Sequence, residues 1–297
     1  MLPTSTGRTV SPSHLGGITG KDRFSGKVVL ITGASSGIGA GLGREFARHG
    51  AAVALLGRRT ERLEALTAEI RAGGGHALPI PCDVRRDGDL ERAVAIATAG
   101  LGPIDVAVAN AGFGVAGRFA KLHLDDYRRQ FETNVFGVLR TAYATLDELV
   151  RSHGTLVIIG SVAGYVSTPG NSPYAMSKFA VRGFAQALRG ELEPLGVAVV
   201  LITPGFVVSE IRLVDNRGTL HPDAPDTVPS WLRMPTERAA RQIVRATAGR
   251  RREKIVTLHG KLAVFMQRHF PWLVTRVTRR GRMSRREPGD AQRRPTT

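Results

Sequence analysis

The chain has 297 residues, 42% of them hydrophobic, and carries a formal net charge of +17. This length and apolar content suit one large α/β domain or two small ones. The single cysteine, Cys82, excludes an intrachain disulfide framework, and the chain lacks the run of about 18 apolar residues that a membrane span requires.

The two ends of the chain differ from its middle. Residues 1–23 are rich in Ser, Thr, Gly and Pro and lack the apolar core of a secretory signal, which predicts a disordered lead-in. Residues 261–297 form an apolar and basic extension, where nine arginines from Arg268 onward accompany two acidic residues, Glu287 and Asp290. We expect this extension to end in a disordered Arg-rich tail. One cysteine and no secretory signal favour a cytoplasmic protein.

The basic extension leaves its partners open. A basic tail can meet nucleic acid, anionic lipid or nothing at all. No nucleic-acid-binding motif accompanies the arginines, so nucleic acid is not expected. Residues 260–278 mix apolar and basic side chains, and Pro271 breaks or kinks any helix there. This segment fits packing on the domain, which is the default interpretation, subunit contact, or a peripheral position on an anionic membrane.

Between residues 24 and 260, predicted strands and helices alternate. Short apolar runs predict strands at 28–32, 51–56, 77–82, 104–109, 155–159 and 197–203, with an edge strand at 254–258. Longer amphipathic segments predict helices at 42–49, 61–72, 90–99, 125–151, 173–195 and 236–247. The alternation predicts an α/β fold, a Rossmann-like doubly wound parallel sheet of about seven strands in a single domain, with helices on both faces.

A long polar, Pro-rich segment at 206–234 interrupts this alternation. Its length is typical of a lid over a site, although a passive surface insertion fits equally well.

A glycine-rich turn, Thr32-Gly-Ala-Ser-Ser-Gly-Ile-Gly39, joins the first strand to the first helix. Glycines at 33, 37 and 39 allow a tight turn, close approach to a pyrophosphate and close helix packing. The N-terminus of the helix then offers free N–H groups to phosphates. The position after a strand and before a helix is the context in which this pattern indicates dinucleotide binding.

The second strand ends in Leu56-Gly57-Arg58-Arg59. An acidic residue there would accept hydrogen bonds from a ribose and repel a 2′-phosphate. Arginines suit a phosphate instead, so the sequence favours NADP(H) over NAD(H).

Tyr174 and Lys178 stand four residues apart in a predicted helix and therefore share one face. A nearby ammonium favours the phenolate and lowers the pKa of the phenol, which suits a general acid or base.

These motifs, in this order, resemble those of the short-chain dehydrogenase/reductase family over about residues 24–254. The resemblance rests on the glycine turn, Asp83, Asn110-Ala-Gly112, Asn134, Ser161, Tyr174 with Lys178, and Pro204-Gly205. Gly160 and Met176 depart from common family residues without affecting the chemistry, and Ser209 replaces a common threonine while keeping its hydroxyl.

The resemblance implies a role for each matching residue. Ser161 would hydrogen-bond the substrate oxygen, and Tyr174 would donate or accept the proton. Lys178 would lower the pKa of Tyr174 and hold the nicotinamide ribose, while Asn134 would position a water in a proton relay. The expected cofactor-binding residues are Gly33, Ser35, Ser36, Gly37, Ile38, Gly39, Arg58, Arg59, Asp83, Val84, Asn110, Ala111, Gly112, Tyr174, Lys178, Pro204, Gly205, Val207 and Ser209. No metal is expected.

The sequence thus predicts an NADP(H)-dependent oxidoreductase that acts on an alcohol/carbonyl pair. We expect an apolar small-molecule substrate, in a pocket built from Phe113, Val162, Val166, Phe206 and the 206–234 segment. The resemblance implies a homodimer or homotetramer. The alternative is a non-catalytic dinucleotide-binding regulator. Such a protein would not need a tyrosine with a lowered pKa, so Tyr174 and Lys178 argue against it.

Overall fold

The computed structural model describes residues 23–226 and 228–280. The predicted lead-in, apart from Arg23, and the Arg-rich tail from residue 281 lie outside the described residues.

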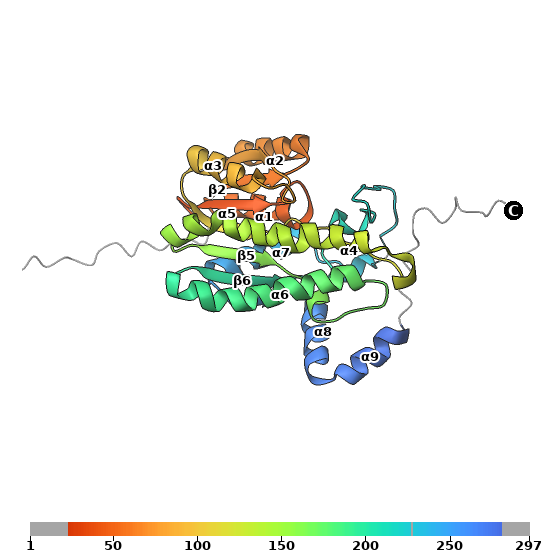
Figure 1. Ribbon diagram of the computed structural model, residues 1–297. Helices are drawn as coiled ribbons and strands as arrows, with labels where there is room; N and C mark the ends of the chain where they lie inside the picture. The colour runs from red at the N-terminus through yellow and green to blue at the C-terminus, as the bar shows by residue number, and fades with distance from the viewer. Residues whose placement is uncertain (1–22, 227, 281–297) are drawn as a thin grey trace, which may run out of the picture.

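Seven parallel strands form one sheet, as the alternating pattern predicts (Figure 1). The strands are β1 (Val28–Thr32), β2 (Ala52–Gly57), β3 (His76–Pro81), β4 (Ile104–Ala109), β5 (Thr155–Ile159), β6 (Ala198–Thr203) and β7 (Glu253–Ile255). Their order is β3-β2-β1-β4-β5-β6-β7. The order reverses between β1 and β4, where ligands of such sheets bind beyond the carboxyl ends of the strands.

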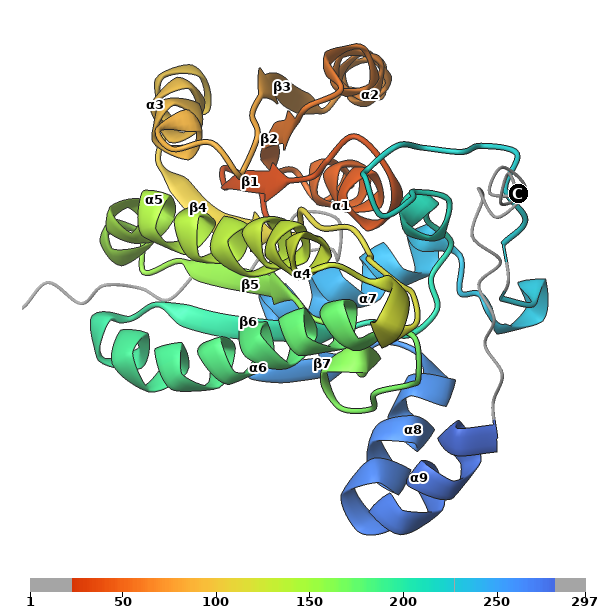
Figure 2. The ribbon, with the colours of Figure 1, turned by 45° about the vertical axis from the view of Figure 1, so that its right-hand side comes forward.

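Helices cover both faces of this sheet (Figure 2). One layer holds α1 (Gly37–Arg48), α2 (Thr60–Ala72) and α7 (Thr236–Ala248), and the other holds α3 (Asp89–Leu101), α5 (Gly137–Arg151) and α6 (Ser172–Leu192). Strand residues point alternately into the two cores, since Val29 and Ile31 join the first while Val28 and Leu30 join the second. Burial on both faces explains why these strands are continuous apolar runs.

The predicted helix at 125–151 contains a π-helical turn. Helix α4 (Leu124–Phe131) continues through Glu132–Phe136, which is π-helical, into α5. Such turns occur frequently at functional sites, and this one carries Asn134.

The predicted edge strand at 254–258 is wrong at its C-terminal end. The side chain of Thr257 accepts a hydrogen bond from the backbone N–H of Gly260 at 3.2 Å and caps α8 (Leu258–His269). Pro271 then opens α9 (Pro271–Arg280), as its fixed φ and missing N–H favour. The predicted boundary between catalytic domain and extension, at 260/261, falls inside α8. The two helices project from the body of the molecule (Figure 2).

Short 3₁₀ turns complete the fold at Phe119–Lys121, Val162–Gly164, Glu193–Leu195, Glu210–Arg212 and Ser230–Leu232.

Candidate active site

A cavity of about 1740 Å³ opens at the carboxyl edge of the sheet. Pockets for one small ligand measure about 300–1,000 Å³, so this cavity has room for a dinucleotide and a substrate together. Ser161, Tyr174 and Lys178 all line it. So do the expected cofactor-binding residues except Gly39, namely Gly33, Ser35, Ser36, Gly37, Ile38, Arg58, Arg59, Asp83, Val84, Asn110, Ala111, Gly112, Pro204, Gly205, Val207 and Ser209.

The glycine turn uses its glycines in two ways. Gly33 and Gly37 have φ of +66° and +51°, where a side chain would be strained. Gly39 lies behind the cavity wall, and a Cβ there would lie 2.6 Å from Nδ2 of Asn110. Its role is close packing of α1 against the turn.

Asn110 and Thr32 hold this turn against the end of β4. The Asn110 amide donates to the carbonyl oxygens of Thr32, at 2.9 Å, and of Gly33, at 3.2 Å. The Thr32 hydroxyl accepts the backbone N–H groups of Asn110 and Ala111 at 3.0 and 3.1 Å. Asn110 therefore shapes the cradle, and Thr32, absent from the expected site residues, is its counterpart on β1.

Arg59 is tied to the glycine turn. Its guanidinium donates to the hydroxyls of Ser35, at 3.0 Å, and Ser36, at 2.7 Å, and pairs with Glu210 at 2.8 Å. Burial opposes ionisation of Glu210, but hydrogen bonds from Arg59 and Arg62 lower the pKa of this carboxyl. Glu210 belongs to the 206–234 segment, so Arg59 fastens that segment to the glycine turn. No local sequence signal pointed to it.

Arg58 stands beside Arg59 with its side chain exposed on the cavity wall. Within the part of the chain that the structure describes, it makes no hydrogen bond or ion pair. A guanidinium in this state is available to an anionic group in the cavity.

The Asp83 carboxylate already has a partner. The guanidinium of Arg85 reaches it at 2.6 Å. Burial opposes ionisation, but the side-chain and backbone hydrogen bonds from Arg85 lower the pKa of Asp83. Contact of Asp83 with an adenine stays a prediction.

Lys178 and Tyr174 lie one turn apart on α6. The lysine side chain is almost fully buried, and its Nζ donates to the carbonyl oxygen of Ile159 at 2.9 Å. The same Nζ lies 5.7 Å from the centroid of the Tyr174 ring. Burial lowers the pKa of Lys178 to about 8, because desolvation disfavours the ammonium.

Ser161 follows β5 directly and begins the turn Val162–Gly164. Its Oγ accepts the backbone N–H of Ala163 at 3.1 Å, which fixes the hydroxyl at the cavity wall. Gly160, the residue before it, would place a Cβ 3.1 Å from the carbonyl oxygen of Ile202. Gly160, which stands where a second serine is common in the family, therefore lies where β5 and β6 are in close contact.

Asn134 is fully buried and does not line the cavity. Its Oδ1 accepts the N–H of Phe113, and its Nδ2 donates to the carbonyl of Phe113, both at 3.1 Å. Nδ2 also lies 3.3 Å from the hydroxyl of Ser177. The amide joins the π-helical turn to the segment after β4 and to α6. Its part in a water relay stays a prediction.

His259 is a site residue that the sequence did not reveal. Its Nε2 accepts the backbone N–H of Phe206 at 3.0 Å, and its ring stacks on that of Phe206. Burial lowers the pKa of His259, which keeps Nε2 available as an acceptor. A Cβ at Gly205 would clash with His259 and Thr257. Helix α8 therefore supports the Pro204–Phe206 turn.

The part of the cavity that the sequence assigns to the substrate has apolar lining residues, and the cavity lining also includes Arg118, Lys121, Arg129, Arg212 and Arg217. Phe113, Val162, Val166 and Phe206 all line it, as expected. The 206–234 segment adds further apolar side chains, Ile211, Val214, Leu220 and Val228. Within this segment Asp226 pairs with Arg212 at 2.8 Å and Arg233 at 3.0 Å. Hydrogen bonding from Arg212 lowers the pKa of Asp226 to about 2.

Comparison with known proteins agrees with this arrangement. The family model described as short chain dehydrogenase matches residues 27–218. A dehydrogenase/reductase SDR family protein 7-like of Dictyostelium discoideum is 32% identical over 262 residues, which cover 86% of this chain and 81% of the relative.

Solved structures show the same fold. A short-chain dehydrogenase/reductase of Burkholderia phymatum in complex with NAD has a TM-score of 0.75 at 23% identity, covering 84% of this chain and 96% of its own. An alcohol dehydrogenase of Thermococcus sibiricus, complexed with 5-hydroxy-NADP, has a TM-score of 0.66 at 27% identity, covering 77% and 95%. Because the family model spans well over half of the sequence, the chain belongs to the short-chain dehydrogenase/reductase family, whose members are oxidoreductases that bind a nicotinamide dinucleotide.

Proposed function

We propose that the protein transfers a hydride between NADP(H) and an apolar alcohol/carbonyl substrate, with Tyr174 as the general acid and base. One observation carries this proposal. Ser161, Tyr174 and Lys178 line the same cavity as the glycine turn.

Each group has a definite task in this cavity. The nicotinamide, when bound, supplies or accepts the hydride. Ser161 hydrogen-bonds the carbonyl oxygen of the substrate, and Tyr174 gives its proton to the same oxygen as negative charge develops there. Lys178 in its charged form stabilises the resulting phenolate. In the direction of alcohol oxidation, Tyr174 takes the proton back.

The residues around the glycine turn suit a dinucleotide. Gly33 and Gly37 leave the backbone of the turn open to the cavity, and α1 directs its N-terminus there. Arg58 on the cavity wall, with no acidic residue at the end of β2, supports NADP(H) over NAD(H). The Thermococcus sibiricus enzyme, solved with an NADP derivative, also supports this choice.

The remaining features of the proposal concern the whole protein. The family resemblance supports a homodimer or homotetramer, and the single cysteine supports a cytoplasmic location. Light scattering on the purified protein measures the first, and fractionation of the cell measures the second.

Replacing Tyr174 by phenylalanine tests the chemistry. General acid–base groups contribute about 10²- to 10⁴-fold to rate. We expect Tyr174→Phe to lower NADPH oxidation with a panel of apolar ketones by this factor, while NADPH binding, followed by fluorescence, persists.

Tyr143→Phe is the matched control, because Tyr143 is 74% exposed on α5 and lies outside the cavity lining. Equal turnover in the wild type and Tyr174→Phe would refute the assigned mechanism. Tight NADPH binding without turnover by the wild type would favour the regulator instead.

A further inference from the structure

We propose that α8, α9, Trp231 and a second, basic groove along α7 form one docking face for an anionic phospholipid bilayer. The basic groove is defined by seven cationic side chains on its walls, Arg23, Arg238, Arg241, Arg245, Arg251, Lys254 and Lys261.

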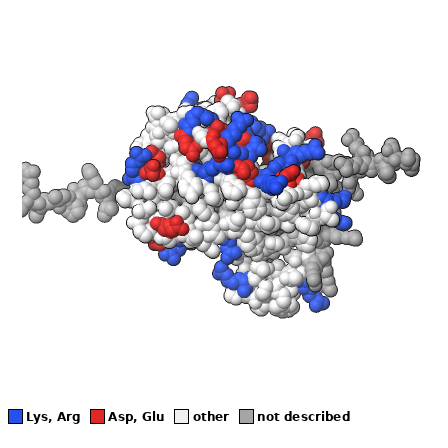
Figure 3. Space-filling model, in the orientation of Figure 1, with Lys and Arg blue, Asp and Glu red and all other residues white. Residues whose placement is uncertain are grey.

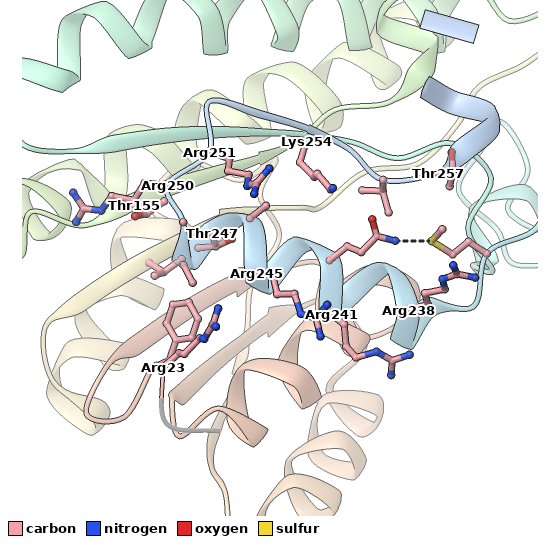
Figure 4. Close-up of a pocket in the computed structure, with 18 of the residues that line it drawn as sticks. Arg23, Thr155, Arg238, Arg241, Arg245, Thr247, Arg250, Arg251, Lys254 and Thr257 are labelled. Carbon is pink, nitrogen blue, oxygen red and sulfur yellow. Dashed lines mark hydrogen bonds between the residues drawn. The ribbon is translucent and has the colours of Figure 1, made fainter. Parts of the chain in front are cut away.

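The basic groove measures about 1810 Å³ and is distinct from the active-site cavity, although His259 lines both. Arg238, Arg241 and Arg245 follow one another along α7 at spacings of three and four residues (Figure 4). Arg251 and Lys254 stand on the chain segment beside that helix (Figure 4). The spacing places the three α7 arginines on one side of the helix.

Lys27, Arg233 and Arg250 also line the basic groove and already have partners, which are Asp105, Asp226 and the backbone carbonyls of Gly196 and His153. The seven cations that define the groove differ from these three. Asp105 is the one acidic residue among the described residues that line it, and it pairs with Lys27 at 2.8 Å. The seven defining cations make no ion pair or hydrogen bond within residues 23–226 and 228–280. Burial and the charges of Lys261 and Arg251 lower the pKa of Lys254. Repulsion of this kind favours an anionic ligand.

Exposed apolar side chains adjoin these cations. Leu258, Leu262 and Phe265 form a stripe along α8 and are 80%, 62% and 53% exposed. Trp231 and Trp272 are 82% and 67% exposed. Leu258 and Trp231 also line the basic groove, so the apolar and cationic surfaces are continuous.

The α8–α9 projection carries no acidic residue. Residues 258–280 contain Lys and Arg but neither Asp nor Glu. The face of the projection seen in Figure 3 shows no acidic side chain, whereas the upper part of the molecule mixes both charges. The opposite side of α8 is already committed, because Gly260 and Val264 pack into the domain.

Exposed apolar side chains beside unpaired cations indicate which ligand the docking face binds. An apolar helix face bordered by cations is typical of helices that lie in the plane of an anionic membrane, with tryptophan at the interface. Nucleic acid would account for the cations but not for the exposed leucines. A second copy of this chain would bring two strongly cationic surfaces together, and the one acidic residue among the described residues that line each groove, Asp105, is already paired with Lys27. Among the described residues no helix is long and apolar enough to span a bilayer, so the contact is peripheral.

Cosedimentation of the full chain with vesicles tests the proposal. We expect binding to mixed phosphatidylcholine–phosphatidylglycerol vesicles, weakened by salt, and none to phosphatidylcholine alone. A cation near an anionic surface strengthens binding about fivefold. The double variant Arg241→Gln/Arg245→Gln should therefore bind about 25-fold more weakly. Leu262→Gln/Phe265→Gln should also bind more weakly, through the apolar contact.

Matched controls alter other surfaces. Arg128→Gln/Arg151→Gln removes the same charge from α4 and α5, and Phe119→Gln/Leu124→Gln changes residues that are 80% and 64% exposed. Both controls should bind as the wild type does. The two test variants change exposed side chains, and thermal unfolding confirms that each remains folded.

Three outcomes overturn the proposal. Equal losses in test and control variants would show unspecific attraction. Binding of inorganic polyphosphate or single-stranded RNA, with vesicles ignored, would assign the basic groove to a soluble polyanion. A dimer that Leu262→Gln/Phe265→Gln abolishes, without vesicle binding, would assign the face to a second copy. Because the assay contains neither cofactor nor ketone, its result is independent of the proposed catalytic function.

Discussion

Burial of Lys178 has two effects that bear on its proposed catalytic role. Its amine is buried and bonded to the backbone of β5, so it stays in place beside Tyr174. The same burial brings the pKa down from 10.5 to about 8. The residue is therefore mostly charged at neutral pH and loses its charge just above it.

The first prediction concerns pH. Carbonyl reduction should slow as the pH rises through about 8, because neutral Lys178 no longer stabilises the Tyr174 phenolate. Stability should respond in the opposite sense: burying the ammonium costs free energy below about 8, and this cost is lifted between about 8 and 10.5. Profiles of kcat/KM and of unfolding midpoint against pH measure both. A rate that stays level well above pH 8 would contradict the assignment.

Arg58 carries the second prediction. Replacing it by alanine should raise KM for NADPH about 10- to 150-fold, because hydrogen bonds to charged groups contribute about 1.5–3 kcal/mol. KM for NADH should change little. Arg62→Ala is the control, since Arg62 shares the partner Glu210 with Arg59 but lies outside the cavity lining. An equal effect on both cofactors would remove Arg58 from 2′-phosphate recognition.

At the scale of elements, the site depends on turns that are held by hydrogen bonds from other elements. The glycine turn is fastened by Asn110 at the end of β4, and the Pro204–Phe206 turn by His259 on α8. The π-helical turn of Glu132–Phe136 is joined to the segment after β4 by Asn134. Each contact joins the segment after a strand to a neighbouring element, so the cavity wall is held by residues distant in sequence.

A substitution at Gly205 tests the contact between the Pro204–Phe206 turn and α8. A Cβ there meets Thr257 and His259, so Gly205→Ala should displace the N-terminus of α8. Overpacking of this kind costs about 1–3 kcal/mol of unfolding free energy. Gly183→Ala is the counterpart, because a Cβ at that position in α6 meets no atom within 4 Å. It should stabilise the protein by about 0.5–1 kcal/mol. Denaturant unfolding measures the unfolding free energy of both variants. Equal changes in the two would show that the contact between Gly205 and α8 does not contribute to stability.

At the scale of the whole molecule, α8 belongs to two surfaces. Its Ala263 lines the active-site cavity, its Leu258 and Lys261 line the basic groove, and its His259 lines both. The predicted boundary at 260/261 would divide this helix between catalytic domain and extension. We propose that the functional division falls at Pro271 instead, because α8 contributes to both cavities.

Two truncations distinguish a functional division at 260/261 from one at Pro271. Removing 271–297 should leave stability and ketone turnover unchanged. Removing 258–297 should lower the unfolding free energy by at least the burial of Val264, about 1.5–3 kcal/mol, and reduce turnover through loss of His259. Circular dichroism and NADPH oxidation report the two effects. Full activity without residues 258–297 would show that α8 does not support the site.

Local pattern determined much of this protein. Apolar runs alternating with amphipathic segments specify the strands, the helices and hence the parallel sheet, because hydrophobic period depends on neighbouring residues alone. The glycine turn and the Tyr174–Lys178 pair are equally local, because the first lies within a single turn and the second within five residues of one helix. The residues predicted from them line one cavity, with Gly39 and Asn134 packed just behind it.

Tertiary structure alone decided the remaining contacts. Arg59 and Glu210 are 151 residues apart, and Phe206 and His259 are 53 apart. The basic groove gathers Arg23 with α7 and α8. No periodicity relates such positions, because their distance depends on how the whole sheet and its crossovers pack. Sequence thus predicted which groups line the cavity, and folding decided which groups hold them there and where unpaired charge collects.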